Sequence, residues 1–195
     1  MQTSKIRRMV EMAALIAVIV VLQAVATFVK IGPFPITLTL IPIVLGATLY
    51  GPKTGAVLGG AFGVVVLIMV ITGADPGGNL LWQVNPLLTA LLCLLKGILA
   101  GFVAGIVNLG VKKINAYAGV ICAAVVCPIV NTGIFIAGMA LFFHATLVSW
   151  AGDTNVVYYA LIGLTGINFL IEFIANAVMG PVLFVIGKVL RGINV

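Results

Sequence analysis

Charge is scarce in this sequence. Only 7% of the 195 residues are charged, with ten bases, four acids and one histidine, whereas 63% are hydrophobic. A soluble domain carries about 25% charged residues, so too little charge is present to cover a surface in water. This balance excludes a soluble domain, a disordered chain and a nucleic-acid-binding protein, and it predicts an integral membrane protein.

Cysteine and histidine are scarce as well, and this limits the chemistry of the chain. Cys93, Cys122 and Cys127 are odd in number, lie in apolar runs and form no CxxC pair, which excludes a disulfide framework. His144 is alone and cannot supply a metal-binding cluster. No Ser–His–Asp set and no Walker-type nucleotide loop appears. We therefore expect no catalytic residue, no metal site and no cofactor, and hence a non-enzyme without an energy source of its own.

The sequence does contain six apolar runs, separated by connections rich in Gly, Pro, Asn and Asp. A helix needs about 20 residues to cross the hydrocarbon layer. The first run follows several bases, as a signal peptide does, but it is long enough to span and we read it as a retained helix. The second run is short and contains Pro42, so we expect a kinked or tilted helix there. The runs are Met9–Val29, Thr37–Tyr50, Thr54–Thr72, Pro86–Leu109, Tyr117–Phe143 and Val157–Leu190.

These runs predict an all-α integral membrane protein with six transmembrane helices, forming a single domain over residues 1–195, with the connections 73–85 and 144–155 read as loops. With six spans, both termini share one side of the membrane. Only Lys30 falls on the opposite side, and Lys96 lies inside the fourth run. The positive-inside rule then places both termini in the cytoplasm of a multi-pass cell-membrane protein. The bases on that side are Lys5, Arg7, Arg8, Lys53, Lys112, Lys113, Lys188 and Arg191.

Small residues recur at every fourth position in three of the runs. Glycine occupies every fourth place from Gly51 to Gly63 and from Gly97 to Gly105. Such faces let helix backbones approach closely, and we expect the glycines to serve internal packing. The pair Ala13 and Ala17 in the first run has the same spacing. It is compatible with internal packing and with a docking face for another membrane protein.

Charged residues within the apolar runs need an explanation, since each costs roughly 3 kcal/mol on insertion scales. Glu11 lies near the end of its run, where Arg7 or Arg8 is in reach, and we assign it a structural role. Lys96 and Glu172 lie deeper, about 15 Å and 21 Å from the outer ends of their runs. Similar depths permit a salt bridge between them, and they equally permit contact with a ligand.

Amide side chains lie at similar depths in two further runs. Asn131 is about 18 Å and Asn168 about 15 Å from the outer end of its run, and Asn168 shares a helix face with Glu172. We interpret this zone as a polar pocket beneath an outer loop that carries Trp82 and Asn85. The alternative is a hydrogen-bonded network that only locks helices together. The candidate substrate-binding residues are Trp82, Asn85, Lys96, Asn131, Thr132, Asn168 and Glu172.

Several stretches resemble one family over nearly the whole chain. They are similar to the substrate-binding S components of energy-coupling factor (ECF) vitamin transporters, and within that family most similar to the pantothenate-specific S component. The stretches are KIRRMVEMAALIAVIVVLQ, which contains Ala13 and Ala17, GPFPITLTLIPIVLGATLYGPKTGAVLGGAFG, LTALLCLLKGILAG, CPIVNTGIF and GINFLIEFIANAVMGP.

The resemblance implies a vitamin-capturing subunit of an ABC-type importer. Its partners would be a membrane scaffold subunit and two cytoplasmic ATPase subunits, which would consume the ATP. In the family, alanines on the first helix contact the scaffold, so Ala13 and Ala17 would be the docking residues. The resemblance also implies that the subunit topples within the bilayer to carry its ligand inward.

Other functions stay open at this point. S components for riboflavin, folate, pyridoxine-like compounds, niacin and queuosine precursors share the architecture that the resemblance implies. An autonomous secondary transporter is a different class, but the sequence shows no clear inverted repeat or pair of broken helices. A membrane enzyme is opposed by the missing nucleophile and metal-binding sets.

Overall fold

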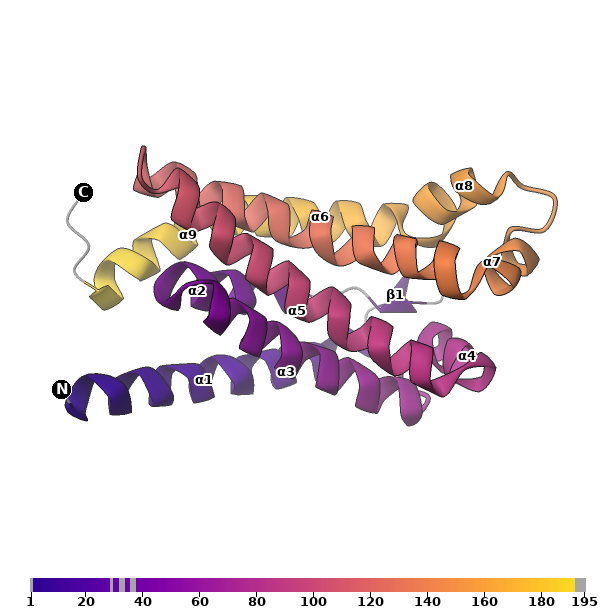
Figure 1. Cartoon of the computed structure of the whole chain (residues 1–195), viewed down its shortest axis with the longest axis horizontal. Helices are drawn as coiled ribbons and strands as arrows, with labels where there is room; N and C mark the ends of the chain where they lie inside the picture. Colours follow the sequence, from indigo (N-terminus) through magenta and orange to yellow (C-terminus); the bar gives the residue numbers. More distant parts are fainter. Residues whose placement is uncertain (1, 29, 32–33, 36–37, 192–195) are drawn as a thin grey trace.

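The computed structural model describes residues 2–28, 30–31, 34–35 and 38–191, and this part of the chain is almost entirely helical (Figure 1). Two antiparallel strands of two residues each, β1 and β2, form a hairpin between the first two helices. The elements are α1 Gln2–Ala26, β1 Lys30–Ile31, β2 Phe34–Pro35, α2 Leu40–Tyr50, α3 Pro52–Ile71, α4 Pro76–Val84, α5 Pro86–Val111, α6 Ala116–Phe142, α7 His144–Ala151, α8 Val156–Tyr158, the π-helical η1 Tyr159–Leu164 and α9 Gly166–Arg191.

Five of the described helices, α1, α3, α5, α6 and α9, are long and apolar enough to cross a membrane. The second run was predicted to be a sixth span, but it forms only the 11-residue α2. At a rise of 1.5 Å per residue that is about 16 Å, roughly half of the hydrocarbon thickness. Pro42 lies in the first turn of this helix, where its missing backbone donor costs no helical hydrogen bond.

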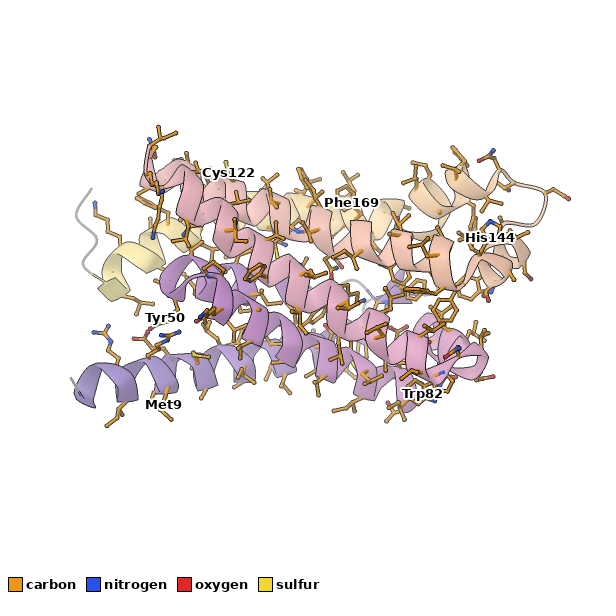
Figure 2. All side chains as sticks on the ribbon, viewed as in Figure 1. Met9, Tyr50, Trp82, Cys122, His144 and Phe169 are labelled. Carbon is orange, nitrogen blue, oxygen red and sulfur yellow. The ribbon has the colours of Figure 1, made fainter. Side chains whose placement is uncertain are left out.

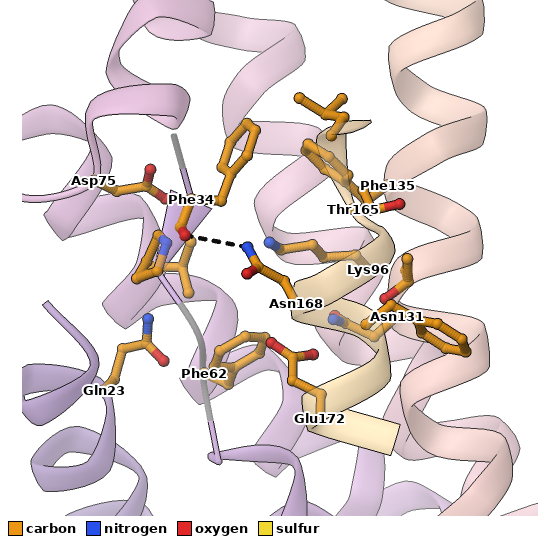
Figure 3. A pocket seen from close by; sticks show the side chains of 15 residues that line it. Gln23, Phe34, Phe62, Asp75, Lys96, Asn131, Phe135, Thr165, Asn168 and Glu172 are labelled. Atoms are coloured by element: carbon orange, nitrogen blue, oxygen red, sulfur yellow. Dashed lines mark hydrogen bonds between the residues drawn. The ribbon is translucent and has the colours of Figure 1, made fainter. Parts of the chain in front are cut away.

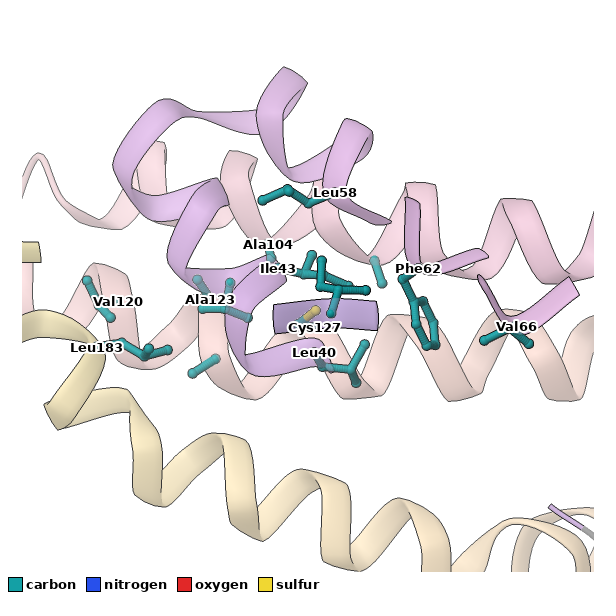
Figure 4. Packing of buried hydrophobic residues seen from close by; sticks show 14 of the residues in the cluster. Leu40, Ile43, Leu58, Phe62, Val66, Ala104, Val120, Ala123, Cys127 and Leu183 are labelled. Carbon is teal, nitrogen blue, oxygen red and sulfur yellow. The ribbon is translucent and has the colours of Figure 1, made fainter. Parts of the chain in front are cut away.

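The short α2 lies at the centre of one half of the bundle. It contacts all five of the long helices. Its buried side chains join the main core cluster, in which Ile43 of α2 lies among Leu58 of α3, Ala104 of α5 and Cys127 of α6 (Figure 4). The described helix of this run begins at Leu40, and the hairpin lies beyond that end of α2, on the side of α4 and α7 (Figure 1).

The glycine pattern was predicted to serve internal packing, and the structure confirms this. A Cβ on Gly55 would overlap the backbone carbonyl of Gly101, and one on Gly59 would overlap that of Gly97. The backbones of α3 and α5 therefore touch along the glycine faces. Only residues without a side chain permit this approach, which gives the pair its close dispersion contact.

Two connections that were read as loops contain helices instead. The stretch 73–85 forms α4 because Asp75 caps it, its Oδ1 accepting a hydrogen bond of 2.9 Å from the Gly78 amide, and Pro76 occupies the first helical position. The stretch 144–155 contains α7. These helices lie at the end of the bundle opposite to the N-terminus (Figure 1).

Arginines tie the N-terminal end of α1 to the rest of the bundle. Arg7 pairs with Glu11 at 2.8 Å, as predicted, and donates a 2.7 Å hydrogen bond to the carbonyl of Leu190 near the end of α9. Arg8 donates to the Thr54 hydroxyl at 2.8 Å. The start of α1 and the end of α9 therefore lie at the same end of the molecule.

Candidate ligand-binding site

A pocket with a cavity volume of about 70 Å³ lies between the hairpin and the long helices (Figure 3). Side chains from α1, the hairpin, α3, α5, α6, η1 and α9 converge on it. The lining residues are Gln23, Phe34, Pro35, Phe62, Val66, Asp75, Lys96, Asn131, Thr132, Phe135, Leu164, Thr165, Asn168, Phe169 and Glu172.

The structure brings together five of the seven residues that the sequence singled out. These are Lys96, Asn131, Thr132, Asn168 and Glu172, from α5, α6 and α9. The other two, Trp82 and Asn85, do not line the pocket. Asn85 caps α5, its Oδ1 accepting a hydrogen bond of 3.1 Å from the Leu88 amide, and Trp82 packs against the main core cluster.

Two amide groups at the pocket wall present acceptors that nothing in the described part of the chain satisfies. The Oδ1 atoms of Asn131 and Asn168 are buried and have no hydrogen-bond partner there. On its other side, Asn168 donates from Nδ2 to the carbonyl of Phe34 at 3.1 Å. Buried polar groups are nearly always hydrogen-bonded. Two orphaned acceptors in one cavity therefore fit a ligand that carries hydroxyl or N–H donors.

Lys96 is the one base among the pocket-lining residues that the structure describes. Its ammonium lies 5.4 Å from the ring centroid of Phe135 and 5.9 Å from that of Phe62. The salt bridge to Glu172 that the sequence permitted is not found between these two described residues. The ammonium is thus available at the wall of the pocket for an anionic group.

Two carboxylates also line the pocket, and both are buried. Glu172 on α9 is 5% exposed, and so is Asp75, which precedes α4 and uses one oxygen to cap that helix. A carboxylate accepts hydrogen bonds and donates none when ionised. The two amide oxygens favour hydroxyl or N–H donors on a ligand, and the Lys96 ammonium favours an anionic group on it.

A π-helical distortion before the last transmembrane helix positions the side chains that α9 contributes to the pocket wall. The chain forms the wide π-turn of η1 before it continues as α9, and the Thr165 hydroxyl donates to the carbonyl of Ala160 at 3.0 Å. Single π-turns in helices are frequent at functional sites. From this point Asn168 and Glu172 follow one turn apart on the same face, so both point into the cavity (Figure 3).

Comparison with known proteins identifies the family. Residues 7–189 match the family described as "ECF transporter, substrate-specific component". The chain is also similar to the "Pantothenic acid transporter PanT" of Lactococcus lactis subsp. cremoris (strain MG1363), with 28% identity over 187 residues that cover 92% of each chain. The chain belongs to the ECF transporter substrate-specific components. It is therefore a multi-pass protein of the cell membrane and a component of a transporter.

Several residues that line the pocket of this substrate-specific component were missed in the sequence. Gln23 is 2% exposed and accepts a hydrogen bond of 3.2 Å from the Thr39 hydroxyl. The rule that identified Lys96 also applies to Gln23, a polar residue within an apolar run. By contrast, Phe62 and Phe135 look like any other apolar residues of a membrane helix, so no signal in the sequence distinguished them.

The alanines that resemble a docking motif lie on the outside of the substrate-specific component. Ala13 and Ala17 are both exposed on α1, on the side of the helix turned away from the bundle. The neighbouring Met9 is 70% exposed and points outward in the same way (Figure 2). These alanines therefore do not serve packing within the described chain, and their role in docking stays a prediction.

Proposed function

We propose that this chain is the pantothenate-capturing subunit of an ECF-type vitamin importer. It would take up pantothenate from the outer side of the membrane into the pocket between α5, α6 and α9. It would then release the vitamin on the cytoplasmic side, after docking on a module that hydrolyses ATP.

One observation of the site supports this substrate above all. Lys96 lines the same cavity as Asn131 and Asn168, and among the described residues its ammonium has no ion pair and the two amide oxygens have no hydrogen-bond donor. Pantothenate has one carboxylate, one secondary amide and two hydroxyls, so it offers one anionic group and three donors. The carboxylate suits Lys96, and the donors suit the two amides and Glu172. The name of the Lactococcus relative, a pantothenic acid transporter, points to the same vitamin.

The energy for transport would come from partner subunits. The family implies an ECF module, which we propose consists of a membrane scaffold subunit and two cytoplasmic ATPases. The exposed position of Ala13 and Ala17 supports a docking face on α1, because small side chains allow another helix to approach closely. ATP would be used by the partners, and the chain itself would hold no cofactor.

A binding assay of the isolated chain against a panel of vitamins tests the proposed substrate. The ligand-free protein in detergent is titrated calorimetrically with pantothenate, pyridoxine, folate, riboflavin, niacin and a queuosine precursor. We expect saturable binding of pantothenate, with each other compound binding at least about 100-fold more weakly, or about 2.7 kcal/mol. Tighter binding of another vitamin would keep the family and remove pantothenate as the substrate.

A further inference from the structure

Lys96 is held at the pocket wall by aromatic rings. Lysine is long and flexible, so a pocket that uses its ammonium needs something to fix it. In the described part of the chain no hydrogen bond or ion pair of Lys96 is found, and its ammonium lies over the rings of Phe135 and Phe62. A ring face attracts a cation through its quadrupole. Unlike a carboxylate, it leaves both the charge and the N–H donors available.

The ring of Phe135 also packs against a second aromatic ring. It meets the ring of Phe34 edge-to-face, with centroids 5.0 Å apart and an angle of 75° between the planes. The ring centroids of Phe34 and Trp150 of α7 are 6.4 Å apart. The backbone carbonyl of Phe34 accepts the hydrogen bond from Asn168. Edge-to-face pairs are the favoured geometry of aromatic rings. Phe135 therefore connects the hairpin at the pocket to the ammonium of Lys96 (Figure 3).

We propose that Phe135 is a positioning residue that holds the Lys96 ammonium toward the pocket and so sets the preference of this site for a carboxylate over an uncharged group. The inference rests on the proposed function, since it concerns the recognition of pantothenate by the same pocket. Phe135 acts on the ligand through Lys96. Its loss should affect the anionic ligand selectively, whereas a loss of packing would affect charged and uncharged ligands alike.

Three substitutions at this position separate the ring from the volume that it fills. Phe135→Leu and Phe135→Met remove the ring but keep an apolar side chain, and Phe135→Tyr keeps the ring. Dissociation constants are measured for pantothenate and for its uncharged alcohol analogue, pantothenol. We expect Phe135→Leu and Phe135→Met to weaken pantothenate about threefold to tenfold and pantothenol less than about twofold. Phe135→Tyr should bind pantothenate within about twofold of the wild type.

A second phenylalanine of the same pocket provides the control. Phe169 lines the cavity, but its ring is not among those over the Lys96 ammonium in the described structure. Phe169→Leu should therefore change the affinity for both compounds by the same factor. If Phe135→Leu does not fold, as judged by gel filtration and thermal unfolding, Phe135→Met decides the question with a flexible side chain of similar volume.

The outcomes distinguish this inference from the proposed function. An equal loss for both compounds in the Phe135 variants, or a selective loss in Phe169→Leu as well, would overturn the positioning role while pantothenate capture stands. A wild-type protein that binds neither compound would overturn the proposed function itself.

Discussion

A lysine inside the bilayer is costly for a protein, by roughly 3 kcal/mol on insertion scales. Among the described residues, Lys96 forms no salt bridge with Glu172 that would offset this cost. It lies over two rings at the wall of a cavity that is also lined by Asn131 and Asn168, whose buried amide oxygens have no hydrogen-bond partner among the described residues. We infer that the ligand supplies an anionic group for Lys96 and hydrogen-bond donors for the two amide oxygens.

Replacing this lysine tests the inference at the level of one side chain. Lys96→Met should weaken pantothenate strongly and pantothenol much less. Loss of one partner of a desolvated charged contact costs about 2–5 kcal/mol, which corresponds to roughly thirtyfold to several thousandfold in affinity. Calorimetric titration of both compounds measures the two losses, and Lys96→Arg serves as the charge-retaining control.

The rival explanation, a structural pair of Lys96 with Glu172, gives the opposite result in a double variant. Were the pair structural, Lys96→Met would lower the unfolding temperature, and Lys96→Met/Glu172→Leu would restore both stability and pantothenate binding. We expect no restoration of binding. Recovered affinity in the double variant would remove Lys96 from the site.

Much of the site could be predicted from the sequence, because polar residues are rare in membrane helices and a count along the helix gives their depth. This placed Lys96, Asn131 and Glu172 in one zone, and the structure puts them around one cavity. Asn85 was placed on a loop above the pocket, but it caps α5 instead, and capping depends on local backbone geometry that the sequence pattern did not show. It could not find Phe135, whose role depends on which side chain approaches its ring.

At the level of helices, the contact of α3 with α5 depends on glycine. Gly59→Ala should lower stability by about 1–3 kcal/mol, because its Cβ would overlap the carbonyl of Gly97 and force two backbones apart. The adjacent Gly60 is a matched control, since a Cβ there would lie 3.5 Å from Ile98, an ordinary contact. The unfolding temperatures of both variants in detergent provide the comparison. Equal losses of unfolding temperature in Gly59→Ala and Gly60→Ala would contradict the prediction that the close contact of α3 with α5 depends on Gly59.

The exposed face of α1 carries a second prediction at this level. Ala13→Trp or Ala17→Trp should abolish uptake by the assembled transporter and leave pantothenate binding by the isolated chain unchanged, because a large ring would hold the partner helix away. Val18→Trp is the control, since Val18 is 46% exposed but lies about 100° around the helix from Ala17. A loss of ligand binding in the alanine variants would place these residues in internal packing instead.

The helices were predicted with different success, for physical reasons. Long apolar runs gave α3, α5 and α6 within a few residues, since hydropathy alone specifies a span. The second run, Thr37–Tyr50, was read as a span, but its helix α2 begins at Leu40 and is too short to cross the hydrocarbon layer. The π-turn of η1 left no signal, since it differs from an α-helix only in its hydrogen-bond register.

For the whole molecule, the arrangement separates capture from energy supply. The central α2 contacts all five long helices, and the pocket lies among the hairpin, α3, α5, α6 and α9. Arg7 and Arg8 at the start of α1 lie at the same end of the bundle as the C-terminal end of α9. This is the end at which the sequence predicts the cytoplasmic bases. Such a chain can hold a vitamin, and we propose that a partner must drive its release.

Reconstitution tests this central claim most directly. Uptake of labelled pantothenate is measured in proteoliposomes that contain this chain alone, or the chain with a purified ECF scaffold and its two ATPases, with and without ATP. We predict binding by the chain alone but no accumulation, and accumulation only with the complete module and ATP. Accumulation by this chain alone, driven by an ion gradient, would contradict the account and identify a secondary transporter.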